Sequence, residues 1–180
     1  MTVYTIGHST RSVDELIALL REAGVDLVAD VRSYPRSRRN PQFNGDALPA
    51  TLADAEIGYR HAKALGGRRG GHELDRPSPN GFWENEAFRN YADYALTPAF
   101  REALAGLIDC ARKRTVAIMC AEAVWWRCHR RIVADYLLAA GVEVRHILGP
   151  AKIEPARMTP EAEPQPDGGI HYPAPQPSLL

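Results

Sequence analysis

The sequence has no excess of either charge sign and few cysteines. Its 180 residues carry 22 basic and 22 acidic side chains. The net charge therefore does not indicate a polyanionic partner such as a nucleic acid. The length is typical of one domain. Three cysteines are an odd number and do not indicate a disulfide framework. We therefore expect reduced thiols and a cytoplasmic location.

Long apolar runs and repeats are also missing. No apolar run approaches the ~18 residues of a membrane-spanning helix, so we expect no membrane partner. The first residues do not show the basic start and apolar stretch of a signal peptide. The chain has no internal repeat.

Charge is nevertheless uneven along the chain. Residues 32–72 hold eight basic side chains and three acidic ones, a local balance of +5. The eight basic residues are Arg32, Arg36, Arg38, Arg39, Arg60, Lys63, Arg68 and Arg69. This distribution favours a partner that is an anionic small molecule or a nucleic acid.

Hydrophobic periodicity predicts alternating strands and helices. We expect strands near residues 3–7, 27–31, 58–61, 115–119 and 142–148. We expect helices near residues 12–24, 46–55, 84–94, 97–111 and 129–140. Ser12 and Glu15 form a capping box at the start of the first helix, and Thr97 followed by proline starts the fourth.

This order predicts the fold class. Strand, helix and strand within about 30 residues form a βαβ unit and hence a parallel sheet. We expect a three-layer α/β domain over residues 1–149, with a mainly parallel sheet of four or five strands and helices on both faces. Eight of the 14 prolines lie between residues 150 and 177. We therefore expect residues 150–180 to be an extended proline-rich tail, packed on the domain or trailing from it.

Reactive residue types follow three of the predicted strands. His8 and Ser9 follow the first strand, Arg32 follows the second, and Cys120 and Glu122 follow the fourth. Ligands bind outside the carboxyl ends of strands in open parallel sheets. We therefore expect one polar cleft there, lined by His8, Arg32, Arg36, Cys120, Glu122, Cys128, His129 and Arg130.

The segment from Cys120 to Arg130 resembles an anion cradle. A cysteine at a strand end is followed by a loop and then by arginines at a helix start, where free amides and guanidinium groups hold oxyanions. The same field lowers a thiol pKa, and the sequence does not decide between Cys120 and Cys128. Candidate catalytic residues are Cys120, His8, Cys128 and Glu122. Candidate ligand-binding residues are Arg32, Arg36, Arg38, His129, Arg130, Ser9 and Trp125.

Several motifs together resemble a known family. They are Tyr-Thr-Ile-Gly-His-Ser-Thr-Arg at 4–11, Asp-Val-Arg-Ser-Tyr-Pro-Arg-Ser at 30–37, Asn-Pro-Gln-Phe-Asn at 40–44, Leu-Gly-Gly-Arg at 65–68, Phe-Arg-Asn-Tyr-Ala-Asp-Tyr at 88–94 and Met-Cys-Ala-Glu…Cys-His-Arg at 119–130. They are similar to the bacterial and archaeal family catalogued as domain of unknown function 488, over residues 2–173. The resemblance implies a cytosolic α/β domain with a shared polar site and no established activity.

A weaker resemblance is to rhodanese-like domains. Those carry Asp-Val-Arg after an early strand and a catalytic cysteine at a later strand end, as Asp30, Arg32 and Cys120 stand here. The loop after Cys120 differs, because it is longer, lacks the glycines and carries Glu122. The likeness therefore indicates architecture rather than chemistry.

Each candidate has a structural alternative. Cys120 is either a nucleophile or a small apolar side chain at a strand end. Cys120, Cys128, His129 and His8 are possible metal ligands, but seven residues between the cysteines exceed the usual two to four, and we expect no metal. His8 is either an acid/base or a partner of Asp30, and the arginines of residues 32–39 form either a binding surface or a solvated loop.

Three functions remain open at this point. The first is an enzyme acting on a phosphate-bearing or nucleotide substrate through a thiolate or His8. The second is a nucleic-acid-binding accessory domain without catalysis, in which Tyr34 and Phe43 stack on bases. The third is a metal-binding protein. The cofactor and the oligomeric state are both open.

Glu122 distinguishes these functions, because a carboxylate repels an anion unless it is neutralised. We expect it to pair with Arg127, Arg130 or Arg32, so that Glu122→Gln lowers stability and Arg130→Ala abolishes anion affinity.

Overall fold

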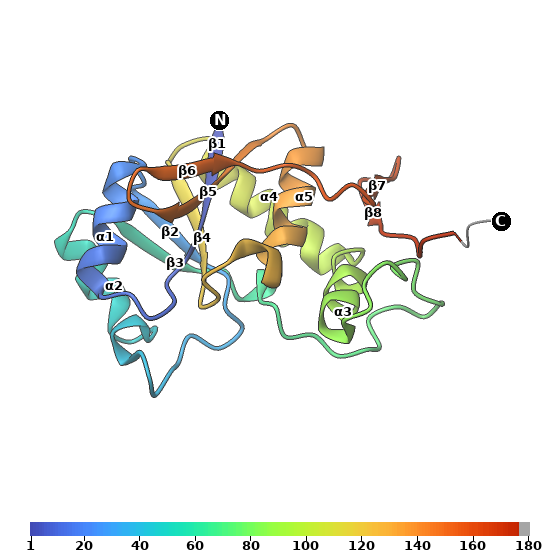
Figure 1. Ribbon diagram of the computed structural model, residues 1–180, viewed down its shortest axis with the longest axis horizontal. Coiled ribbons are helices and arrows are strands. Elements are labelled where there is room, and N and C mark those ends of the chain that lie inside the picture. Colours follow the sequence, from blue (N-terminus) through green and yellow to red (C-terminus); the bar gives the residue numbers. More distant parts are fainter. Residues whose placement is uncertain (177–180) are drawn as a thin grey trace.

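The computed structural model describes residues 1–176 of the chain. Its centre is a six-stranded sheet in the order β3-β2-β4-β1-β5-β6 (Figure 1). The strands are β1 (Thr2–Gly7), β2 (Leu27–Asp30), β3 (Gly58–His61), β4 (Val116–Cys120), β5 (Glu143–Gly149) and β6 (Lys152–Pro155). β1 to β5 are parallel and β6 is antiparallel to β5. The five parallel strands lie where hydrophobic periodicity predicts them.

Helices cover both faces of the sheet. The helices are α1 (Val13–Glu22), α2 (Leu48–Asp54), α3 (Glu86–Tyr94), α4 (Pro98–Ala111) and α5 (Arg130–Ala139). Figure 1 shows α1 and α2 on one side of the sheet and α4 and α5 on the other. Two cores result. One contains Ile6, Ala117 and Met119 from the sheet, and the other contains Val3, Val116 and Ile118, as expected when successive strand residues point to opposite faces.

Local signals explain the element ends. The Ser12 side chain accepts a hydrogen bond from the Glu15 backbone, and the Glu15 carboxylate accepts one from the Ser12 backbone, so the capping box is formed. α1 ends before Gly24, which has a φ of 67°, a conformation that glycine adopts without strain. The Thr97 hydroxyl accepts from the Phe100 backbone at the start of α4.

The proline-rich segment contains strands that the sequence did not predict. It adds β6 to the sheet, and its β7 (Glu163–Pro164) and β8 (Ile170–His171) form a separate two-stranded sheet. Tyr172 is buried, and its hydroxyl donates to Asp135 on α5 at 2.9 Å. Prolines obscure these strands in the sequence because they remove periodicity and ladder donors. The sheet therefore has six strands rather than the expected four or five.

Within residues 1–176, no helix is long and apolar enough to cross a membrane.

Candidate functional site

β1, β2 and β4 end at the same edge of the sheet. Gly7 is opposite Cys120, and Asp30 is opposite Met119. A cavity of about 630 Å³ lies beyond these ends. Eight of the eleven sequence-predicted site residues line it: His8, Ser9, Arg32, Arg36, Cys120, Glu122, Cys128 and His129. Parallel topology is what brings these sequence-distant side chains together.

Gly7 allows the loop after Cys120 to lie against β1. A Cβ on Gly7 would lie 2.7 Å from the Glu122 carbonyl carbon and 2.9 Å from the Ala123 Cα. The two segments also hydrogen bond, since the His8 backbone donates to the Cys120 carbonyl and the Ser9 backbone to the Ala121 carbonyl. Ser9 has a φ of 50°, an uncommon conformation outside glycine. The close approach fixes the loop that follows Cys120 and carries Glu122.

Two cysteines and a histidine that line the cavity lie close together. The Sγ atoms of Cys120 and Cys128 and a ring nitrogen of His129 all lie within 4.8 Å of one another. Cys120 is at the end of β4, and Cys128 and His129 directly precede α5. The three residues are called the Cys-Cys-His cluster below. Neither cysteine is in a disulfide.

The two thiols have pKa values shifted in opposite directions. The hydrogen bond to Cys128 and burial raise the pKa of Cys120. Burial also opposes ionisation of Cys128, but Cys120 and Arg130 outweigh it and lower the pKa of Cys128. Arg130 donates to the Cys128 sulfur at 3.3 Å, and the neighbouring Cys120 thiol and this guanidinium both favour the thiolate form of Cys128.

Arg130 lies behind the cavity rather than in it. It is 1% exposed, and its Nε donates to Cys128 Sγ at 3.3 Å and its Nη2 to the Glu122 carbonyl at 2.6 Å. The expectation that Arg130 lines the cleft is therefore wrong. Its guanidinium turns inward because the loop carbonyl and the sulfur satisfy its donors there.

Glu122 also differs from the expectation. Its side chain is exposed, and within residues 1–176 it forms no ion pair with an arginine. Only its backbone carbonyl meets Arg130. The predicted side-chain pairing of Glu122 is wrong, because a carboxylate that water can solvate gains little from an ion pair.

His8 belongs to a buried network with Asp30 and Arg32. Arg32 donates to both Asp30 oxygens, from Nε at 2.8 Å and from Nη2 at 2.6 Å. Tyr59 donates to the same carboxylate at 2.7 Å. Arg32 Nη2 also donates to the Phe43 carbonyl at 2.7 Å. The charge of Arg32 is thus largely neutralised.

The His8 ring has both nitrogens occupied. Nδ1 lies 2.9 Å from the Ser9 carbonyl and therefore carries the hydrogen, so Nε2 accepts from Arg32 at 3.2 Å. The ring stacks on Phe43 with centroids 4.3 Å apart. Burial, with a contribution from Arg32, lowers the pKa of His8 to about 4. A neutral imidazole whose acceptor is occupied orients Arg32 and is poorly placed to take a proton. Phe43 is fully buried, so the expectation that it stacks on bases is wrong.

Arginines surround the mouth of the cavity. Arg36, Arg68 and Arg127 line it and are exposed, and within residues 1–176 none of them forms an ion pair with a carboxylate. Within residues 1–176, Glu122 is the one acidic residue that lines the cavity. We call these three arginines the arginine rim.

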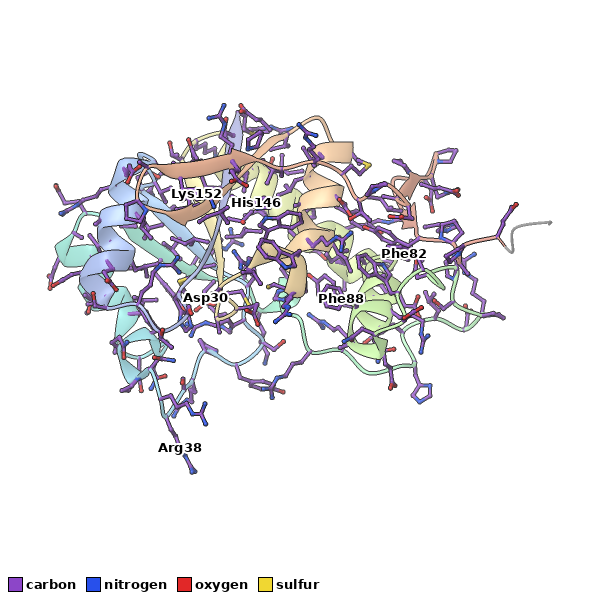
Figure 2. The ribbon with its side chains drawn as sticks, in the orientation of Figure 1. Asp30, Arg38, Phe82, Phe88, His146 and Lys152 are labelled. Carbon is purple, nitrogen blue, oxygen red and sulfur yellow. The ribbon has the colours of Figure 1, made fainter. Side chains whose placement is uncertain are left out.

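Two predicted ligand-binding residues lie elsewhere. Arg38 is exposed and points away from the sheet (Figure 2). Trp125 stacks on His146 with centroids 4.4 Å apart and does not line the cavity. Trp126 is 48% exposed. Arg36 and Arg38 lie in the same irregular loop but point in different directions. Sequence periodicity does not predict side-chain directions in such a loop.

The glycines of the Leu-Gly-Gly-Arg motif were missed as site residues. A Cβ on Gly66 would lie 2.8 Å from the Ser33 Cα, and one on Gly67 would lie 2.8 Å from the His129 Cγ. The Arg68 backbone donates to the Ser33 hydroxyl at 3.0 Å. These glycines let the segment pass directly over His129 and place Arg68 on the rim. The adjacent glycines next to a basic residue were the signal that could have identified them.

The family comparison agrees with these motifs. The family model described as "Domain of unknown function DUF488" matches residues 12–137. The chain belongs to this family. The matched range contains five of the six quoted motifs, and the motif at 4–11 lies outside it. No curated protein and no solved structure matches this family member, and the resemblance to rhodanese-like domains remains a prediction.

Proposed function

We propose that this member of the DUF488 family is an enzyme that binds a phosphate-bearing or nucleotide substrate in the cavity and acts on it with the Cys-Cys-His cluster. One observation carries the proposal. Arg36, Arg68 and Arg127, without carboxylate partners in residues 1–176, line the same cavity of about 630 Å³ as Cys128 and His129.

The arginine rim suits an anion with several oxygens. Guanidinium groups offer planar pairs of donors that match phosphate and carboxylate oxygens. Arg32 contributes little further charge, because Asp30 neutralises it at 2.6 Å. Three free guanidinium groups against one acidic lining residue leave the cavity mouth positive, which raises the local concentration of anions.

The cavity also offers room and an aromatic surface. Its volume is within the roughly 300–1,000 Å³ typical of small-molecule sites. Tyr34 is 65% exposed at the rim, and the Arg68 guanidinium lies 5.8 Å from its ring centroid. An exposed aromatic ring beside phosphate-binding side chains favours a substrate with a planar base, since bases stack on such rings.

Binding of inorganic phosphate and of a nucleoside monophosphate, measured calorimetrically, tests the substrate class. We expect Arg36→Ala, Arg68→Ala and Arg127→Ala each to weaken binding about 10–100-fold, because each removes charge-assisted hydrogen bonds of about 1.5–3 kcal/mol. Arg38→Ala is the matched control, since Arg38 is an exposed arginine of the same loop outside the cavity. Equal losses in Arg38→Ala and the rim variants would contradict the proposal.

Turnover of a panel of phosphate esters and nucleotides tests catalysis. Cys128→Ser should abolish turnover, while phosphate affinity stays within about threefold because the arginine rim is intact. Cys110→Ser is the control, because Cys110 lies on α4 and its sulfur accepts from Arg60. Turnover that survives Cys128→Ser would exclude the cluster as the catalytic group.

A non-catalytic nucleic-acid-binding role is the second candidate. Arg38 and Arg39 are exposed and add positive charge outside the residues that line the cavity. On this hypothesis, a double Arg38→Ala, Arg39→Ala variant loses single-stranded nucleic-acid binding while phosphate binding is unchanged. The affinity must also fall steeply with salt, because each phosphate contact releases counterions. An affinity that is flat in salt rules this role out.

A further inference from the structure

We propose that Cys120, Cys128 and His129 bind one thiophilic divalent metal ion, most favourably Zn²⁺, with a fourth coordination position open to the cavity. Their three potential ligand atoms all lie within 4.8 Å of one another. Tetrahedral zinc with sulfur at about 2.3 Å and nitrogen at about 2.0 Å needs ligand atoms about 3.5–3.8 Å apart. The Cys128 Sγ to His129 Nδ1 distance is already 3.6 Å, so an inward shift of about 1 Å at most closes the site.

The orientation of the His129 ring supports this inference independently. Nε2 lies 2.9 Å from the Val31 carbonyl. A carbonyl only accepts, so Nε2 carries a hydrogen, and Nδ1, which faces the Cys128 sulfur at 3.6 Å, is the ring nitrogen that can bind a metal. Metal-binding histidines show this arrangement, in which the second nitrogen donates to a carbonyl and fixes both tautomer and ring.

The chemistry of the ligand atoms selects the metal. Two thiolates and an imidazole are soft and borderline ligands, which favour Zn²⁺ over Mg²⁺ or Ca²⁺. The seven-residue separation of the cysteines argues against zinc only where both come from one tight loop. Here Cys120 ends β4 and Cys128 precedes α5, so tertiary structure rather than local spacing brings them together.

The surroundings of the cluster fit a catalytic site rather than a closed structural one. Structural zinc sites have four protein ligands, whereas catalytic sites have three and an open position. All three residues line the cavity, and Cys120 is only partly buried. Arg130 donates to Cys128 from its backbone at 3.5 Å and from Nε at 3.3 Å, as hydrogen bonds commonly support metal-bound thiolates.

The catalytic meaning of the site rests on the proposed function, although metal binding itself does not. Zn²⁺ lowers the pKa of a bound water to about 7, which supplies a nucleophile beside an anion held by Arg36, Arg68 and Arg127. The charges of the two thiolates cancel the charge of Zn²⁺. The positive charge of the buried Arg130 then makes the site attractive to a substrate anion.

Metal binding is tested on the full chain after reduction and removal of metal with a chelator. Zn²⁺ is titrated in competition with a chromophoric chelator, and Co²⁺ is titrated while the visible spectrum is recorded. We expect one ion per chain and the strong visible absorption of tetrahedral Co²⁺ with thiolate charge-transfer bands. Cys120→Ser and His129→Gln should each lose affinity by more than the about 10–100-fold typical of supporting residues.

Cys110→Ser and His72→Ala are the matched controls, because both residues lie outside the cluster and should leave affinity unchanged. Gly67→Ala is a positioning test. Its methyl group would lie 2.8 Å from the His129 Cγ, so it should weaken metal binding without removing a ligand. Circular dichroism checks that each variant folds. If Cys128→Ser does not fold, the Cys120→Ser variant and the Co²⁺ spectrum of the wild-type chain still decide whether the cluster binds a metal.

Three results would overturn the inference: no stoichiometric binding, an octahedral Co²⁺ spectrum without thiolate bands, or equal affinity in Cys120→Ser and Cys110→Ser. Phosphate binding by the arginine-rim variants is measured separately with excess chelator present. Loss of metal binding with intact phosphate binding contradicts only this inference, whereas metal binding without phosphate binding contradicts only the proposed function.

Discussion

The Arg130 Nε lies 3.3 Å from the Cys128 Sγ in the interior of the protein. Both residues are at least 96% buried, and Arg130 forms no ion pair with a carboxylate within residues 1–176. A buried guanidinium without a carboxylate is costly unless another group compensates its charge. The Cys128 sulfur and the Glu122 carbonyl are its compensating groups.

Arg130→Ala should therefore lower stability strongly. We expect the free energy of unfolding to fall by about 2–5 kcal/mol, because the Glu122 carbonyl and the Cys128 sulfur lose their buried donor. Urea denaturation measures this change. Arg131→Ala is the control, since Arg131 is the next residue of α5 and its Nε donates to Thr159. A loss below about 0.5 kcal/mol in Arg130→Ala would show that Arg130 does not hold the loop.

Glu122→Gln should behave in the opposite way. The side chain is exposed and unpaired within residues 1–176, so the free energy of unfolding should change by no more than about 0.5 kcal/mol. Phosphate affinity should increase a few-fold, because the substitution removes the one carboxylate among the cavity-lining residues. Thermal melts and phosphate titrations measure both effects. A large stability loss would mean that the carboxylate is paired after all.

Gly7→Ala should disrupt the loop that follows Cys120. A methyl group would lie 2.7 Å from the Glu122 carbonyl carbon, so either the loop or β1 must move. We expect a destabilisation of at least about 1–3 kcal/mol. Gly149→Ala is the matched control, because a Cβ there meets nothing within 4 Å. Urea denaturation measures the free energy of unfolding of both variants. Equal stability of Gly7→Ala and Gly149→Ala would contradict the close approach of the loop to β1.

His146 should make stability depend on pH. Burial, with a contribution from Arg130, lowers the pKa of His146 from 6.5 to about 4. The ring also lies between Thr5, whose Oγ1 is 2.7 Å from Nδ1, and Trp125. Between pH 6.5 and about 4 the unfolded chain binds a proton that the folded chain does not. The contribution of His146 to the free energy of unfolding is therefore fully present above pH 6.5 and is lost as pH falls toward 4.

His146→Gln should reduce this slope. The wild-type chain should lose about 1–3 kcal/mol through His146 over the window. The pKa of His8 is also lowered to about 4 by burial, so a contribution of His8 to the slope remains in the variant. Urea denaturation at pH 7, 5.5 and 4.5 measures the effect. Identical slopes for wild type and variant would exclude His146 as a contributor. His72→Gln, an exposed histidine, is the control.

Local sequence determined the main helices, the five parallel strands and the end of the sheet at which the site lies. The Ser12–Glu15 capping box, the Thr97 cap and Gly24 mark helix ends through hydrogen bonds and backbone conformations that depend on neighbouring residues alone. Five strands followed from apolar periodicity. Because parallel strands share one carboxyl edge, His8, Arg32 and Cys120 were predictable as neighbours without coordinates.

Tertiary structure decided what those neighbours do. Arg130 points inward and Glu122 outward because the Glu122 carbonyl, rather than its carboxylate, meets the guanidinium. Arg36 lines the cavity while Arg38 points into solvent, since side chains of an irregular loop follow no period. The contact between Cys120 and Cys128 depends on how β4 and α5 pack across seven intervening residues. Distances set by long-range packing have no local sequence signal, and the chemistry of the Cys-Cys-His cluster depends on those distances.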